Sequence, residues 1–153
     1  MNQQQTEEYV KKYAEDLLAF FGVNIEVVVS TREDGIDVIV PNTDSSSVLI
    51  GRNGETLRSI QYLLSTVLRN NDAVTSRVNL DIADYKKQRA EKIAAQAREW
   101  IEGVRSTGDS YVARIGAADR RVVHQVATEY EDIQTFSEGE GRDRRIVIAQ
   151  KSS

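Results

Sequence analysis

The order of apolar and polar residues predicts a module of helices and strands in the first half of the chain. Apolar side chains recur every three or four positions over residues 7–21, as on one face of a helix. Two β-branched runs, 24–30 and 36–40, are joined by a turn that contains Asp34-Gly35, a strong hairpin signal. A short helix (44–50), a longer helix (55–69) and an alternating strand (74–82) follow, so the predicted order is α-β-β-α-α-β.

The second half has a different predicted order. A long helix is predicted from about residue 84 to 105, with an apolar stripe along one side. After it we expect a strand, a helix and two further strands, at 111–115, 117–130, 133–136 and 145–149. No low-complexity linker or internal repeat is present. We therefore expect an α+β protein with domains at 7–82 and 83–150, the second opening with the long helix and having the order α-β-α-β-β.

Composition narrows the classes of function. The 153 residues include no Cys, which excludes disulfides, thiolate metal sites and cysteine nucleophiles. The apolar runs are too short to span a membrane, and the first residues have no secretion-signal pattern. We expect a cytoplasmic protein without membrane insertion, without a metal and without a cofactor.

The net charge of −4, from 20 basic and 24 acidic residues, at first argues against a nucleic-acid partner. The charge is unevenly distributed, however. Residues 1–50 hold 3 basic and 9 acidic side chains, whereas residues 51–82 hold 4 and 3, and residues 83–108 hold 6 and 4. This distribution favours modest, salt-sensitive binding of single strands over strong affinity for duplexes.

A glycine-containing loop connects the short helix to the longer one. Gly51 and Gly54 allow a ligand to approach the backbone closely, and between them Arg52 supplies a positive charge beside Asn53. The helix that follows presents N–H groups and a dipole that favour anions. A phosphate backbone could therefore pass over this turn. Taken alone, however, such a loop is more often an ordinary corner between two helices.

The single histidine, His124, lies one helical turn after Arg120. Helical geometry places Arg120, Arg121 and His124 on one polar side, opposite the side that carries valines and Ala127. This pattern predicts that His124 is not part of the core. An Arg and a His one turn apart can hold a phosphate or stack on a base. The alternative is that both side chains are merely solvated on an amphipathic helix.

The segment 50–63, Ile-Gly-Arg-Asn-Gly-Glu-Thr-Leu-Arg-Ser-Ile-Gln-Tyr-Leu, resembles the signature of bacterial type II KH domains. The predicted order α-β-β-α-α-β matches that fold over about residues 7–82. In KH domains the Gly-x-x-Gly loop clamps the backbone of about four single-stranded nucleotides, and the bases lie in an adjacent apolar groove. The resemblance implies that Gly51, Arg52, Asn53 and Gly54 form such a clamp.

The stretches 119–124, 135–141 and 144–148 are similar to the small domain named for its Arg-x-x-x-His motif, which binds single-stranded nucleic acid. This similarity implies binding by Arg120, Arg121 and His124, with support from Arg58, Arg144 and Arg145. The tandem order resembles the bacterial Jag family, also called KhpB or SpoIIIJ-associated proteins. Longer members carry an additional amino-terminal Jag domain, for which we expect no room in this chain.

The family resemblance implies a non-enzymatic protein that binds single-stranded RNA. It further implies an RNA chaperone or post-transcriptional regulator linked to cell-envelope growth and cell length, working with a second, single-KH (KhpA-like) protein. The alternative is a protein-interaction adaptor that uses the KH fold for dimerisation, with RNA binding incidental, as the acidic first helix and hairpin would allow. An enzyme with His124 as general acid/base is the weakest hypothesis, because no second titratable partner or metal cluster accompanies it.

Overall fold

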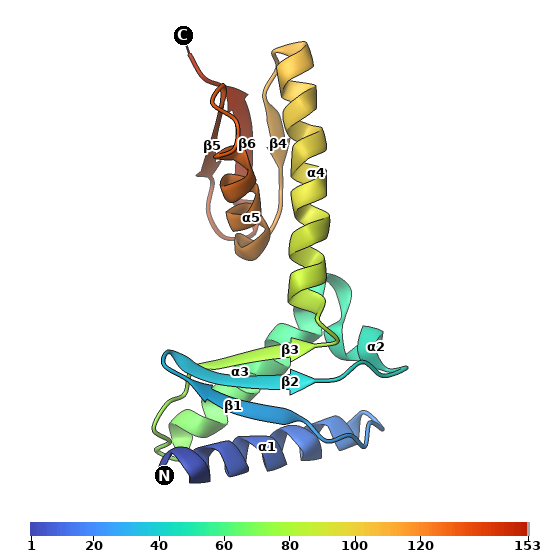
Figure 1. Cartoon of the computed structure of the whole chain (residues 1–153), viewed down its shortest axis with the longest axis vertical. Coiled ribbons are helices and arrows are strands. Elements are labelled where there is room, and N and C mark those ends of the chain that lie inside the picture. The colour runs from blue at the N-terminus through green and yellow to red at the C-terminus, as the bar shows by residue number, and fades with distance from the viewer. Residues whose placement is uncertain (153) are drawn as a thin grey trace. The chain divides into compact units, whose positions relative to one another are not determined.

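The computed structural model describes residues 1–152, which fall into two compact units, residues 1–86 and the residues from Lys87 on. Each unit has an apolar core of its own. The α+β class predicted from the sequence is confirmed. Among the described residues, no helix combines the length and the apolar character needed to cross a bilayer. Figure 1 gives the labels of the helices and strands.

The first unit is a three-stranded sheet with helices packed on it. Its strands lie in the order β1-β2-β3; β1 is antiparallel to β2, and β2 is parallel to β3. The helices α1 and α3 contact each other and the sheet, so they cover the same face. The elements are α1 (Gln3–Phe20), β1 (Val28–Arg32), β2 (Gly35–Val40), α2 (Ser46–Ile50), a 3-10 turn η1 (Arg52–Gly54), α3 (Glu55–Asn70) and β3 (Val78–Ile82).

The first helix begins four residues earlier than its apolar pattern predicts. Asn2 caps α1, because its side chain accepts a hydrogen bond from the Gln5 N–H at 2.8 Å while the Gln5 side chain accepts one from the Asn2 N–H at 3.0 Å. Thr6 is buried, and its hydroxyl donates to the Asn2 carbonyl at 2.7 Å. The extra turn is polar in sequence, which is why an apolar pattern does not reveal it.

Two strands of the first unit are shorter than the sequence predicts, as is β4 of the second unit (Tyr111–Ala113), which is predicted to reach residue 115. The strand expected at 24–30 begins at Val28, and the Val27 N–H donates instead to Glu15 Oε2 at 3.0 Å. The strand expected at 74–82 begins at Val78, opposite Ile36, and Val74 is exposed. The central strand β2 spans only six residues, so it cannot pair with the longer β-branched runs on either side.

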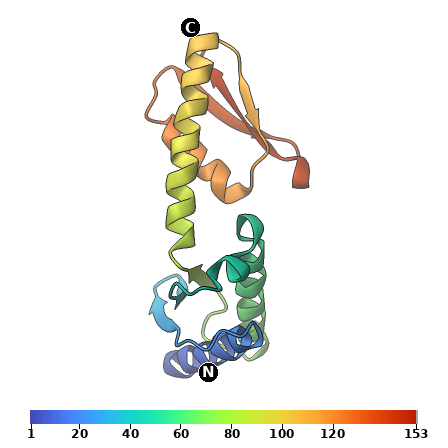
Figure 2. The ribbon, with the colours of Figure 1, turned by 90° about the vertical axis from the view of Figure 1, so that its right-hand side faces the viewer.

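The second unit is an antiparallel sheet with two helices on one face. Its strand order is β4-β6-β5. Core residues of α4, such as Ile101, and of α5, such as Val123, join Ile146 and Ile148 of the central strand in one buried cluster. Figure 2 shows this sheet beside α4. The elements are α4 (Tyr85–Thr107), β4 (Tyr111–Ala113), α5 (Ala117–Ala127), β5 (Ile133–Glu138), a 3-10 turn η2 (Gly141–Asp143) and β6 (Arg145–Gln150).

Two ion pairs from α4 hold the region of α5. One lies near the start of α5, and the other holds the segment that follows it. Arg89 and Asp119 form a half-buried ion pair at 2.9 Å near the start of α5. At the other end, Arg105 reaches Asp132 at 2.9 Å and lies over the ring of Tyr130, 5.6 Å from its centroid. These contacts fix the orientation of α5, which carries the Arg-x-x-x-His motif.

We expect Ile101→Ala to destabilise the second unit. The Ile101 side chain is fully buried in the core of that unit, so its truncation should lower the free energy of unfolding by about 2–5 kcal/mol. The measurement is urea denaturation followed by circular dichroism. Lys92→Ala, an exposed change on the same helix, serves as the control and should change stability by about 0.5 kcal/mol at most. Equal effects of the two changes would contradict the assigned core.

Candidate nucleic-acid interface

The loop between α2 and α3 has a left-handed backbone at three of its four positions. The φ angles are +72° at Gly51, +54° at Asn53 and +77° at Gly54. Glycine adopts this region without a Cβ penalty, and Asn tolerates it better than most residues. The residue types at these positions therefore follow from the backbone conformation that links the two helices.

The two glycines are also required by the neighbours of the loop. A Cβ on Gly51 would collide with the Thr56 side chain, and a Cβ on Gly54 would lie 3.0 Å from a ring carbon of Tyr85. The loop is thus packed against the first turn of α3 and the first residue of α4. Arg52 and Asn53 remain exposed at its tip. The structure brings all four predicted clamp residues together on one turn.

Arg58, predicted as a supporting basic residue, lies beside this loop. Its guanidinium Nη1 donates to the Asn53 carbonyl at 2.7 Å. This bond connects the tip of the loop to α3, so Arg58 helps to hold the loop in shape. Glu55 is exposed in the first turn of α3, and no side chain among the described residues caps that turn. The exposed positive charge at the tip is that of Arg52.

His124 lies outside the buried core cluster, as the sequence predicts, but it is not the merely solvated side chain of the alternative interpretation. His124 is half-buried against β5: its Nδ1 lies 2.6 Å from Thr135 Oγ1, and its Nε2 lies 3.2 Å from Ser137 Oγ. A helical-wheel argument treats the helix in isolation. Here the polar side of α5 packs against a strand whose alternate residues carry hydroxyl groups.

The two predicted arginines of α5 have different surroundings. Arg120 is half-buried, and its Nη1 donates to the Ile115 carbonyl at 2.6 Å. It lies one turn before His124, so the two residues share one side of α5. Arg121 is exposed and belongs to neither set of hydrogen bonds. The candidate site on α5 therefore consists of Arg120 and His124, together with the hydroxyl groups of β5.

Arg144 and Arg145, also predicted as supporting residues, hold the turn between β5 and β6. Arg144 Nη1 donates to the Gly139 carbonyl at 2.9 Å, and Arg145 Nε donates to Glu138 Oε1 at the same distance. A Cβ on Gly139 would lie 2.7 Å from the Asp143 carbonyl oxygen, so this turn too is tightly packed. Both guanidinium groups are thus partly engaged in hydrogen bonds within the chain.

Sequence reasoning did not assign Thr135 and Ser137 to the site. The available signal was their spacing: two hydroxyl residues at alternate positions of a strand that follows the motif helix lie on one face of the sheet. That spacing does not say which face meets α5. The contact with His124 becomes visible only when the strand and the helix are packed together.

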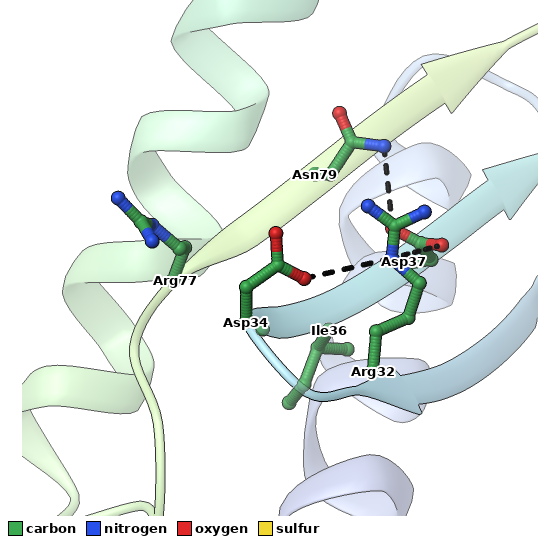
Figure 3. Close-up of a pocket in the computed structure, with 7 residues that line it drawn as sticks. Arg32, Asp34, Ile36, Asp37, Arg77 and Asn79 are labelled. Atoms are coloured by element: carbon green, nitrogen blue, oxygen red, sulfur yellow. Dashed lines mark hydrogen bonds and ion pairs between the residues drawn. The ribbon is translucent and has the colours of Figure 1, made fainter.

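A shallow pocket at the β1–β2 turn carries charges that are paired with one another. Arg32 Nε lies 3.3 Å from Asp37 Oδ2 and 3.7 Å from Asp34 Oδ1, and the Asn79 amide donates to Asp37 Oδ1 at 3.3 Å (Figure 3). Within residues 1–152, no cluster of three His, Cys, Asp or Glu side chains is arranged to hold a metal ion.

Comparison with known families assigns both halves of the chain. The family described as KhpA/KhpB, KH domain, matches residues 7–82, and the domain family named for its Arg-x-x-x-His motif matches residues 90–150. The chain belongs to the KhpB/Jag family. The two matches include the loop at Gly51–Gly54 and the motif helix α5.

Curated KhpB proteins share this similarity over most of the chain. The RNA-binding protein KhpB of Clostridium symbiosum is 30% identical over 130 residues, which cover 84% of this chain and 58% of the relative. KhpB of Bacillus subtilis is 27% identical over 71% of this chain and 53% of its own length. KhpB of Lactiplantibacillus plantarum is 28% identical over 71% of this chain and 34% of its own length. The chain thus spans between about a third and three fifths of these relatives.

We expect Gly51→Ala to destabilise the protein more than Gly22→Ala does. Both glycines have left-handed φ angles, +72° and +77°, so each substitution should cost about 1–3 kcal/mol in backbone strain, and the ψ of 178° at Gly51 is one that only glycine adopts readily. Only at Gly51 does the added methyl group also meet a packed neighbour, Thr56; the space around Gly22 is open. Urea denaturation of both variants compares the two costs. A Gly51→Ala variant no less stable than Gly22→Ala would refute the packed loop.

Proposed function

We propose that the chain is a non-enzymatic binder of single-stranded RNA that uses two sites. One is the clamp loop at Gly51–Gly54, and the other is the Arg120/His124 face of α5. The observation that carries the proposal is the packed Gly-x-x-Gly loop, with Arg52 exposed at its tip, in a domain of the KhpA/KhpB KH family. The relatives described as RNA-binding proteins support it.

The clamp loop suits a sugar–phosphate backbone for steric and electrostatic reasons. Its glycines present no side chain toward a passing strand, and Arg52 supplies a charge for a phosphate. The first turn of α3 adds N–H groups and the positive end of the helix dipole. Such contacts hold the strand in position without selecting its sequence.

The α5 face offers donors of a different kind. Arg120 has guanidinium N–H groups beyond the one that bonds to Ile115, and His124 presents a ring beside the Thr135 and Ser137 hydroxyls. Arginine and hydroxyl groups bind phosphate oxygens, and a histidine ring can stack on an unpaired base. This face therefore fits a single strand better than a duplex with stacked bases.

Two modest sites on one chain suit a protein that remodels or regulates RNA. The second contact forms at a high effective concentration once the first is made, so the affinity rises without a strong individual site. We propose a cytoplasmic RNA chaperone or post-transcriptional regulator, linked to cell-envelope growth and cell length, that works with a second, single-KH protein. This part of the proposal rests on the family alone.

Arg52→Asp combined with Asn53→Asp should weaken binding of single-stranded RNA by roughly tenfold or more, because the loop would then repel phosphate. The measurement is a gel shift with single- and double-stranded RNA at several salt concentrations. Lys12→Asp with Asn24→Asp changes the net charge equally at two exposed positions outside the loop and is the matched control. Full affinity in a folded double mutant would exclude the clamp, and cleavage of the RNA would instead favour an enzyme.

Arg120→Ala should flatten the salt dependence of RNA binding by about 0.7 units of slope, the value for one phosphate contact on a single strand. His124→Ala should weaken binding at every salt concentration if the ring stacks on a base. Binding titrations over a range of salt concentrations measure both effects. Arg142→Ala, which removes the same charge from an exposed turn, should leave the slope nearly unchanged. An identical slope in Arg120→Ala and the wild type would place the RNA elsewhere.

A further inference from the structure

A lysine at the start of α4 is held between α3 and the edge of the first unit's sheet. Lys86 Nζ donates to Gln61 Oε1 at 3.0 Å and to Asn79 Oδ1 at 2.5 Å. Gln61 Oε1 also accepts a hydrogen bond from the Leu80 N–H at 2.9 Å. Leu80 belongs to β3, which is an edge strand. Lys86, Gln61 and Asn79 thus form a small polar cluster, named here the Lys86 cluster.

Contacts with the sheet determine how the side chains of the Lys86 cluster are oriented. The Asn79 amide donates to Asp37 Oδ1 at 3.3 Å (Figure 3). The Asn79 carbonyl oxygen is therefore the atom that accepts from Lys86. Asp37 is in turn paired with Arg32 at 3.3 Å. This chain of contacts across three strands fixes the position of the ammonium group. Such preorganisation is what a recognition group requires.

The Lys86 cluster lies beside the clamp loop. Gln61 follows Arg58 by three residues on α3, and residues three apart are neighbours on a helix surface. Arg58 reaches the Asn53 carbonyl at the tip of the loop. Tyr85, which precedes Lys86, is in contact with the position of Gly54. A strand held by the loop would therefore have a base close to the cluster.

The cluster offers donors that the chain does not use. In the described part of the chain, Lys86 donates to two side chains, which leaves one of its three N–H groups uncommitted, and the Gln61 amide nitrogen has no acceptor. Desolvation lowers the pKa of Lys86, although the charges of Asp81 and Asp37 act to raise it. The Lys86 side chain is nevertheless exposed, as are its two hydrogen bonds, so its remaining N–H group is open to a ligand.

We propose that Lys86 and the Gln61 amide recognise a carbonyl oxygen of a nucleobase next to the clamp, so that this site prefers uracil or guanine over adenine. The inference rests on the proposed RNA binding and adds base selection to it. Uracil presents O2 and O4 and guanine presents O6, whereas adenine has an amino group where guanine has its carbonyl. The donors of the Lys86 cluster match these carbonyl oxygens, whereas the amino group that adenine presents at the corresponding position is itself a donor and cannot accept from them.

The test compares short oligouridine and oligoadenosine of equal length by fluorescence anisotropy on the full chain. The wild type should bind oligouridine roughly tenfold more tightly. Lys86→Met, which keeps the aliphatic stem, should reduce this ratio to about twofold, chiefly by weakening oligouridine. The neighbouring Lys87→Met removes an equal charge from an exposed position, and should weaken both oligonucleotides by the same factor.

A second variant tests the inference in case Lys86→Met disturbs folding. Gln61→Glu keeps an oxygen acceptor for Leu80 and Lys86 but replaces the amide donor, so it should fold and still lose the preference for uridine. The inference would be overturned if the wild type bound oligouridine and oligoadenosine equally well, or if the variants kept the wild-type ratio of affinities. It would also be overturned if Lys86→Met weakened both oligonucleotides equally, because Lys86 would then have only a structural role. Failure of the wild type to bind either oligonucleotide would instead overturn the proposed function.

Discussion

The parallel pairing of β2 with β3 is the constraint on which the first unit depends. Parallel neighbours cannot be joined by a tight turn, so the chain must leave the sheet and return in the same direction. The segment α2–loop–α3 is this crossover, and the clamp loop is the corner at its middle. The same pairing places Asn79 opposite Asp37 and delivers Lys86 to the side of α3. The candidate contacts with RNA in this unit thus have one topological origin.

In the second unit the equivalent constraint is the contact between α5 and β5, which combines buried apolar side chains, such as Val123 and Ile133, with hydrogen-bonded polar ones. His124 bonds to two hydroxyl groups of β5, and Arg120 bonds to a backbone carbonyl. These side chains are half-buried yet hydrogen-bonded, and the hydrogen bonds offset the free-energy cost of removing them from water. A polar helix face can therefore be a structural contact and a binding surface together.

Apolar periodicity predicted the helices well, because α3 and α4 bury one regular stripe each. Apolar periodicity failed to predict strand ends and side-chain burial where these depend on a segment far along the chain. Residues 24–27 and 74–77 have β-branched sequences but no strand beside them, and His124 has a polar helix side that β5 covers. The Lys86 cluster could not be predicted at all, because Lys86, Gln61 and Asn79 become neighbours only through the packing of α3 on β3. The candidate clamp could be proposed from the sequence because its four residues are consecutive.

The ready-made shape of the clamp loop bears on the kinetics of any complex that it forms. The left-handed positions and the Arg58 bond to Asn53 are in place before a ligand arrives, so little chain ordering accompanies binding. The exposed charge of Arg52 acts at a distance and governs how fast a strand is captured. The rigidity of the loop acts only on contact and governs how long the strand stays. Association and dissociation rates are thereby assigned to different residues of one short turn.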